Sequence, residues 1–479
     1  MGCPHGKGNT TREPDIDRRQ FLLSAVAIGG TSALSACIDR EEDSPNPGDR
    51  SDISEETQSN EDTTDPPGEL VDGSQEDADV NDIVYKNLDK ERSQHAWNRY
   101  LRTNHNGIPQ PPRHQIVIMA DVDIWDVSFS EREEMEAAFR TLERAYEWSN
   151  EGLLFTVGYS QAYFDQFPTA LPESAGLSHP QPLSDFESPT LDQYDMCIHL
   201  ASDHAQAILG AEEALFGNVT EINGVSVEHS LEGIVEKRDR RTGFVGEGLP
   251  ANNQDVDGIP DSHPVPDEAP LYMGFVTQQA THESHPFNGE TEDTFVHNQN
   301  SEYGVMIKEG RFEGGTTQQV SHLHLTLESW YNDLSNDERI KRMFSVEADA
   351  DTVGEMGQDG LEATLFPGIE EFTDENEEFG FIGHSTKLAR SREEGVSPLI
   401  RRDFNTTDEG QAGLHFVALQ ETISDFERAR TMMNGSDVSA HFDSVDEQTN
   451  NGILEFIDVQ SRANFLVPPR DLRTLPTPR

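Results

Sequence analysis

The residue types best suited to chemistry in this chain are one histidine and a pair of arginines near its end. His384 directly follows a glycine and can offer a neutral imidazole to a metal ion. Arg401 and Arg402 come after two aliphatic residues, which favours a buried approach over a surface pair that serves solubility. A guanidinium is permanently charged and can stabilise a developing oxygen anion. One histidine among seventeen is weak support by itself, so the order of the surrounding motifs matters.

That order is completed by an apolar run that follows the arginines. In residues 413–420 the side chains alternate in character from one residue to the next, as they do in a half-buried strand. His384, then Arg401, then this strand resembles the C-terminal half of the dye-decolorizing (DyP-type) haem peroxidases, and the resemblance covers most of residues 110–475. The resemblance implies haem b as the cofactor and hydrogen peroxide as a substrate, with an unknown reducing substrate.

The resemblance also implies roles for individual residues. His384 matches the axial ligand of the haem iron, and Arg401 matches the arginine over the opposite haem face, with Arg402 as its neighbour. Phe244 and Phe416 match positions that line the haem pocket, although both would also suit an ordinary core.

Two glutamates are assigned by alignment with the family. Its distal acid is the aspartate of a Gly-Phe-x-Asp-Gly motif, whereas the run 243–248 is one residue longer and carries Glu247. We expect Glu247 to move a proton between the peroxide oxygens, and a glycine-rich turn with a solvated carboxylate is the alternative. Glu455 takes the place of an acid that faces the proximal histidine, where it would make the His384 ligand more basic.

The composition is strongly acidic. The chain has 479 residues, 35 basic and 90 acidic, and a formal net charge of −55. Only seven of the basic residues are lysines. This balance indicates a protein that works in high salt, where like charges are screened over a few ångströms. Nucleic acid is excluded as a partner because no basic face is visible.

The N-terminal segment reads as an export signal. Arg18 and Arg19 precede a short apolar stretch at 21–36, which resembles a twin-arginine signal, and the stretch is too short and too weakly hydrophobic to span a membrane. It ends in a lipobox-like sequence at Cys37. We therefore expect export by the twin-arginine route and a lipid anchor at Cys37 on the extracellular face of the cell membrane. An acidic, disordered linker is expected at 38–82.

Strand and helix patterns alternate through the rest of the chain. The sequence predicts strands at 115–120, 153–158, 195–200, 320–327, 413–420 and 464–467, and helices at 130–146, 203–216 and 424–433. The order strand, helix, strands, helix is repeated once along the chain. This repeat predicts an α+β fold of two ferredoxin-like domains, as in the dimeric α/β-barrel superfamily. The expected domains are residues 83–248 and 316–479, with an insertion at 249–315.

The insertion contains two further patterns with metal-ligand residue types. An Asp-x-Asp-Gly cluster at 255–258 could hold calcium, and His282 with His285 has a spacing that could hold a transition metal. Neither completes a ligand set, so a loop insertion is the default interpretation. His322 and His324 share one face of a predicted strand, where structural packing is the simpler explanation.

The sequence and the resemblance together predict an exported haem peroxidase of DyP type. The alternative is a non-catalytic haem-binding or haem-delivery lipoprotein on the same scaffold, or one that releases iron from haem. A haem-free interaction protein is the third class, and the electron donor and the oligomeric state, including a homo-oligomer, stay open.

Overall fold

The computed structural model describes residues 91–103, 109–122, 129–276, 302–357, 379–391, 398–436 and 444–479. The chain divides into residues 1–66 and a unit of residues 67–479, and every described residue lies in the second. The predicted export signal, the linker at 38–82 and the pair His282 and His285 lie outside the described residues. Among the described helices, none combines the length and the apolar character needed to cross a membrane.

The elements follow one another in two series, one on each side of the predicted insertion. The first series comprises η1 (Asn98–Tyr100), β1 (His114–Val122), α2 (Phe129–Ala145), β2 (Leu154–Ser160), α3 (Gln161–Asp165), η3 (Glu173–Ala175), β3 (Thr190–Leu191), β4 (Met196–Ser202), α4 (Ala205–Leu215), β5 (Glu221–Ile222), β6 (Val225–Ser226), β7 (Val235–Phe244) and α5 (Leu249–Asn252). The second comprises β8 (Thr316–Leu325), α7 (Glu328–Asn332), α8 (Asn336–Met343), α9 (Ala350–Val353), α11 (His384–Ala389), β9 (Ile400–Arg401), β10 (Phe404–Thr406), η7 (Asp408–Gly410), β11 (Gly413–Gln420), α12 (Ile423–Asn434), η8 (Leu454–Phe456), β12 (Ile457–Val467) and η9 (Arg470–Leu472).

The main strands form one antiparallel sheet that closes on itself. Its order is β10-β7-β1-β4-β2-β12-β8-β11-β9, and β10 pairs with β11 as well as with β7. Because β10 joins both ends of the series from β7 to β11, the sheet forms a barrel. Closure pairs the strand edges that an open sheet would leave exposed.

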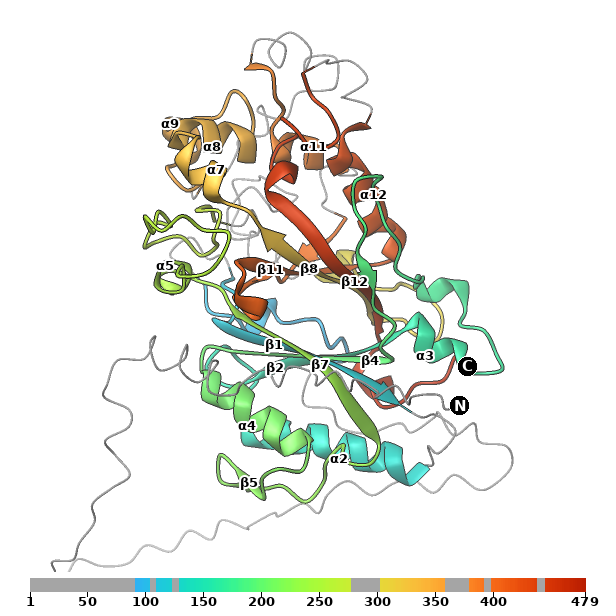
Figure 1. Cartoon of the computed structure of the whole chain (residues 1–479). Coiled ribbons are helices and arrows are strands. Elements are labelled where there is room, and N and C mark those ends of the chain that lie inside the picture. Colours follow the sequence, from blue (N-terminus) through green and yellow to red (C-terminus); the bar gives the residue numbers. More distant parts are fainter. Residues whose placement is uncertain are drawn as a thin grey trace, which may run out of the picture. The chain divides into compact units, whose positions relative to one another are not determined.

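Each half of the barrel repeats the same strand order. The first half runs β7-β1-β4-β2 and the second runs β12-β8-β11-β9, so in both the fourth strand lies beside the first, and the third beside the second. This is the ferredoxin-like order, with helices α2 and α4 packed along one side of the first half (Figure 1). The predicted α+β fold class is confirmed.

The barrel interior is filled by side chains that alternate with outward-facing ones along each strand. Strands from both halves contribute to this core, which comprises Val117, Met119, Cys197, Val245, Val320, Phe404, Val417, Ala463 and Phe465. Cys197, the one cysteine in the described residues, is buried there as a free thiol. Odd-numbered residues of β11, such as Val417, therefore face inward, and even-numbered residues face the helices outside.

Helix α12 shows how local sequence sets the boundaries of an element. Thr422 and Asp425 form a capping box that satisfies the free N–H groups of the first turn. The helix ends at Gly435, whose φ of 64° is easily adopted only by glycine. The predicted helix at 424–433, with its glycine stop, is confirmed.

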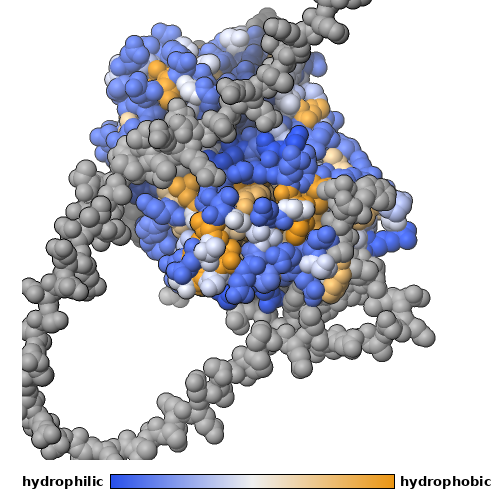
Figure 2. Space-filling model, turned by 60° about the horizontal axis from the view of Figure 1, so that its bottom comes forward, coloured by the Kyte–Doolittle hydropathy of each residue, from blue (hydrophilic) through white to orange (hydrophobic). Residues whose placement is uncertain are grey.

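The described surface is hydrophilic, as the composition leads one to expect. Figure 2 shows hydrophilic residues over most of the visible described surface, with hydrophobic residues in smaller groups between them. Among the described residues, the exposed large hydrophobic side chains are Phe129, Tyr303 and Phe379.

Candidate functional site

His384 begins helix α11, and the backbone around it is closely packed. A side chain on the preceding Gly383 would place its Cβ 2.3 Å from the carbonyl oxygen of Phe344. Gly452 has a φ of +68°, and a Cβ there would lie 3.0 Å from the Cα of His384. Thr386 donates its hydroxyl to the Phe344 carbonyl at 2.9 Å, which fixes the first turn. Two glycines and one hydroxyl thus set the position of the backbone that carries His384.

The imidazole of His384 is buried and surrounded by positive charge. The residue is 6 % exposed, and its Nδ1 has no hydrogen-bond partner in the described part of the chain. Burial, and then the charges of Lys387, Arg401 and Arg430, hold the pKa of His384 well below its usual value. His384 is therefore neutral at physiological pH, which is the form that ligates metal ions.

Lys387 is a buried amine that sequence reasoning did not single out. It lies one turn after His384 on α11, and its Nζ donates to the carbonyl oxygens of Met433 at 2.7 Å and Asn451 at 2.9 Å. Burial lowers its pKa well below the ordinary value. The sequence did offer one signal for Lys387, because the chain has only seven lysines and this one lies one helical turn after His384.

Arg401 lies on the outward face of the sheet. In strand β9 it pairs with Ala418 of β11, and Phe416, two residues earlier on β11, shares that face. The Arg401 side chain is 20 % exposed. Its Nε lies 3.9 Å from the carboxylate of Asp403, a side chain that is only 3 % exposed. Arg401 and Phe416 thus share the outward face of the sheet at β11, where the Phe416 ring lies 6.0 Å from that of Phe426 in α12, and the charge of Arg401 acts on His384.

Arg402 has a different role from the predicted one. Its side chain donates to the carbonyl oxygen of His95 and to the carboxylate of Glu302 at 2.8 Å, with its guanidinium 4.0 Å from the Trp97 ring centre. Burial lowers its pKa to about 10, so it stays cationic at neutral pH. Successive strand residues point to opposite faces, which is why Arg402 anchors the segment around Trp97 while its neighbour Arg401 does not.

Phe244 and Glu247 lie at the end of β7. The ring of Phe244 is buried against Tyr272 at 5.9 Å. Glu247 is exposed, and within the described residues its carboxylate forms no hydrogen bond or ion pair; only its backbone oxygen accepts from Arg113, at 3.5 Å. This geometry matches the alternative weighed for Glu247, a solvated carboxylate in a glycine-rich turn.

Glu455 does not take up the position expected for the partner of the histidine. Its carboxylate accepts from the guanidinium of Arg342 at 3.2 Å and from the backbone N–H of Asn450 at 3.2 Å. Those two donors hold it away from the imidazole, whose Nδ1 stays unpartnered. The chain near Glu455 does pass close to the histidine, because a Cβ on Gly452 would lie 3.0 Å from the Cα of His384, but the carboxylate of Glu455 is bound elsewhere.

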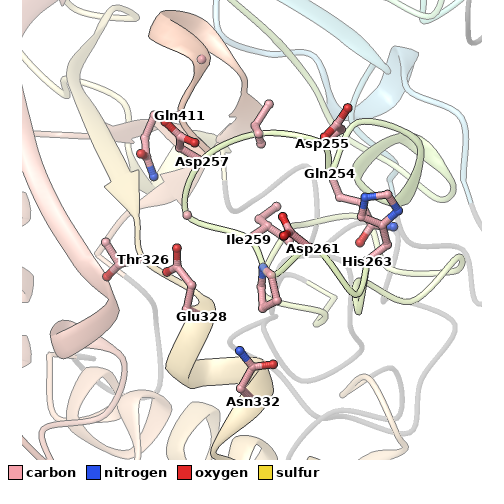
Figure 3. Close-up of a pocket in the computed structure, with 14 residues that line it drawn as sticks. Gln254, Asp255, Asp257, Ile259, Asp261, His263, Thr326, Glu328, Asn332 and Gln411 are labelled. Carbon is pink, nitrogen blue, oxygen red and sulfur yellow. The ribbon is translucent and has the colours of Figure 1, made fainter.

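A separate cavity of about 630 Å³ lies at the loop 254–263. Figure 3 shows this loop, with the predicted calcium cluster, on one side and Gln411, Thr326, Glu328 and Asn332 on the other. The loop is held by Gly258, whose carbonyl accepts from Leu327 at 2.6 Å. The cavity is polar and acidic, and nothing in the described residues indicates which ligand would enter it.

Solved structures that resemble the chain are DyP-type peroxidases. A candidate dyp-type peroxidase from Shewanella oneidensis has a TM-score of 0.51 at 16% identity, covering 76% of this chain and 95% of its own. The encapsulated DyP-type peroxidase from Mycobacterium smegmatis has a TM-score of 0.50 at 14% identity, with coverages of 77% and 96%. A variant of DypB from Rhodococcus jostii RHA1 in complex with haem also reaches 0.50 at 14%, with coverages of 80% and 99%. At these identities the likeness shows the fold.

Comparison with curated proteins finds no match. A family model does match residues 112–469, which is most of the chain and nearly all of the barrel. The chain therefore belongs to the family of unknown function DUF7405.

Proposed function

We propose that this protein binds haem b through His384 and uses hydrogen peroxide to oxidise an unidentified electron donor. The observation that carries the proposal is the neutral, buried imidazole of His384, with an unpartnered Nδ1 and with Arg401 in its electrostatic field. This imidazole belongs to a fold that is similar to that of DyP-type peroxidases, and it lies in the C-terminal half of the chain, where the sequence resemblance predicts the haem ligand.

The residues present fit an axial haem ligand. Neutral imidazole is the proximal ligand in many haem proteins, and a depressed pKa keeps His384 in that form across the physiological range. Bound haem would supply the iron redox chemistry with peroxide, which no side chain can provide. The chain's part is to hold the ligand, through the packing at Gly383 and Gly452, and to place a fixed charge nearby.

Arg401 supplies that fixed charge. A guanidinium keeps its proton at any physiological pH, and in a largely buried site it stabilises an oxygen anion more strongly than in water. Asp403, nearly fully buried with its carboxylate 3.9 Å from Nε of Arg401, forms an ion pair with this guanidinium and is the carboxylate that can exchange a proton near it. We assign that role to Asp403 in place of the exposed Glu247.

The test uses the full-length chain loaded with haem, assayed for peroxide-dependent oxidation of a dye in high salt. Arg401→Gln removes the fixed charge and should lower the oxidation rate by roughly 10²-fold, while haem retention stays unchanged. Asp403→Asn should lower the rate by roughly 10-fold or more, and Glu247→Gln serves as the matched carboxylate control with an unchanged rate. Equal rates in the wild type and Arg401→Gln would remove Arg401 from the reaction.

A second candidate, haem binding or delivery without peroxide turnover, is favoured by two observations. Glu247 is solvated, and Glu455 is paired with Arg342 instead of the imidazole. A proximal histidine without a carboxylate partner is a weaker electron donor to iron. In the same assay this candidate predicts a haem-loaded protein whose dye oxidation does not exceed that of free haem.

The proposed location is the extracellular face of the cell membrane, with a lipid on Cys37 after twin-arginine export. It rests on the sequence alone, through Arg18, Arg19 and the lipobox-like run that ends at Cys37. Mass spectrometry of the N-terminal peptide from the native membrane fraction checks it. A peptide that begins upstream of Cys37 and carries no lipid would contradict it.

A further inference from the structure

We propose that His322, His324 and His415 form a three-histidine site for a divalent transition metal inside the barrel. His322 and His324 are two residues apart on β8, so their side chains share its inward face. On the neighbouring strand β11, His415 is directly opposite His322 in the sheet register. The antiparallel pairing thus gathers three imidazoles at one end of the barrel.

The spacing of the rings suits a shared metal ion. The ring centres of His322 and His324 are 5.0 Å apart, and those of His322 and His415 are 4.7 Å apart. Two imidazoles that bind one zinc ion, each at about 2.1 Å, hold their ring centres about 5 Å apart. The donor atoms do not converge in this structure, where no described group of three or more His, Cys, Asp or Glu forms a ready metal site. Rotation about the side-chain torsions must therefore accompany binding.

One nitrogen of each ring is buried without a hydrogen bond. These atoms are Nε2 of His322, Nε2 of His324 and Nδ1 of His415. The carboxylate of Glu409 lies 3.3 Å from the His324 nitrogen but belongs to an exposed side chain. Leaving a buried polar atom unsatisfied costs about 1–3 kcal/mol, so three together call for a partner. A single metal ion would satisfy all three.

The second nitrogen of His415 is already held in the way that a metal ligand requires. Its Nε2 lies 3.0 Å from the carboxylate of Asp408. Asp408 is itself fixed by the backbone N–H and the hydroxyl of Thr242, at 2.9 and 2.8 Å. With Nε2–H donated to the carboxylate, the Nδ1 lone pair is free for a cation. Such carboxylate–histidine pairs orient metal ligands and raise their basicity.

The charge around the rings also permits a cation. Strand β11 approaches its neighbours closely at Gly413, where a Cβ would lie 2.7 Å from the carbonyl oxygen of Leu323 and 3.6 Å from Nε2 of His322. Arg241 carries a positive charge that would repel a metal cation, but its guanidinium is paired with the carboxylates of Asp192 at 2.6 Å and Asp239 at 3.1 Å. Asp408 and Glu409 add two further carboxylates. Three histidines also leave a fourth coordination position open for water or substrate.

This site is distinct from the proposed haem site. His415 is on the inward face of β11, whereas Arg401 pairs with Ala418 on its outward face. Loss of one site therefore does not imply loss of the other, and their experiments have separate readouts.

The test is a titration of the metal-stripped full-length chain with Co²⁺, followed by visible absorption. We expect one Co²⁺ per chain with the intense bands of a four-coordinate site, displaced by Zn²⁺. His324→Ala, at the more exposed end of the cluster, should weaken Co²⁺ binding at least 10-fold. Asp408→Asn, which removes the carboxylate that positions His415 and one negative charge near the rings, should weaken it by about 10- to 100-fold. Zn²⁺ should raise the melting temperature of the wild type but not of His324→Ala.

Two variants complete the design. His179→Ala, an exposed histidine paired with Asp165, controls for adventitious binding and should leave the titration unchanged. His384→Ala should also leave it unchanged. The proposal is overturned if Co²⁺ binds equally well to His324→Ala and to the wild type, if no Co²⁺ binds, or if His384→Ala abolishes the signal.

Discussion

At the residue scale, the described part of the chain contains a series of histidines whose pKa is lowered mainly by burial. Burial lowers the pKa of His95 and His114 to about 4, and that of His199 to about 3. An unfolded chain protonates these imidazoles near their ordinary pKa of 6.5. Each therefore resists protonation only while the fold is intact, so folding becomes linked to pH.

His199 gives the clearest case, because its Nε2 lies 2.7 Å from the side chain of Gln115 inside the barrel. Its folded pKa lies below its unfolded pKa, so the unfolded state binds more protons between pH 6.5 and about 3. Stability from this group is complete above pH 6.5 and is lost as pH falls, by an amount on the order of 5 kcal/mol. The melting temperature should therefore fall steeply as the pH is lowered through that window.

The matched variant for this prediction is His199→Gln, which keeps an amide partner for Gln115 but does not titrate. Its melting temperature should fall less steeply with acid than that of the wild type. His179→Ala, which removes an exposed histidine, is the control. Identical slopes for the wild type and His199→Gln would contradict the assigned cause.

Sequence reasoning was more successful with residue types than with their contacts. The motif drew attention to Arg401 and Arg402 together, but only the strand pairing shows that Arg401 lies outward and Arg402 is tied to Glu302. The roles of Glu455 and Glu247 rested on alignment, whereas in the structure Glu455 is bound by Arg342 and Glu247 is exposed to solvent. Such contacts are set by tertiary packing, which local sequence does not specify.

At the element scale, the position of α11 depends on Gly452. Gly452→Ala introduces a left-handed backbone penalty at φ +68° and a Cβ 3.0 Å from the Cα of His384. We expect destabilisation of about 1–3 kcal/mol and weaker haem retention, measured by denaturant unfolding and by haem transfer. Gly233→Ala is the control, because its φ is +80° but no atom lies within 4 Å. Equal losses in both variants would show that the contact with α11 does not matter.

Elements whose apolar residues recur with a clear helical or strand period were predictable from the sequence, whereas a strongly charged strand was not. The predicted strand at 413–420 and the strand β11 coincide, and the predicted helix at 203–216 is α4 with slightly shorter ends. Strand β7 was missed because Glu236, Lys237, Arg238 and Asp239 hide its period. Its charges are offset in space, as by the bond from Arg240 to Glu212 on α4, which a local reading cannot find.

At the scale of the whole molecule, a net charge of −55 makes stability depend on salt. Screening shortens from about 10 Å in 0.1 M salt to about 3 Å in 1 M salt, so self-repulsion should weaken strongly. We expect the melting temperature to rise continuously from about 0.1 M to about 3 M NaCl. Sucrose, which stabilises without screening, is the control and should not reproduce the rise. A melting temperature that is independent of NaCl would contradict this account.

The central claim is that His384 holds a haem, and titration of haem into the full-length chain tests it most directly. We predict a Soret band that saturates at one haem per chain, is lost in His384→Ala, and is retained in His179→Ala. Melting curves of both variants establish that each is folded. A folded His384→Ala protein that binds haem with the same stoichiometry and the same band would contradict it.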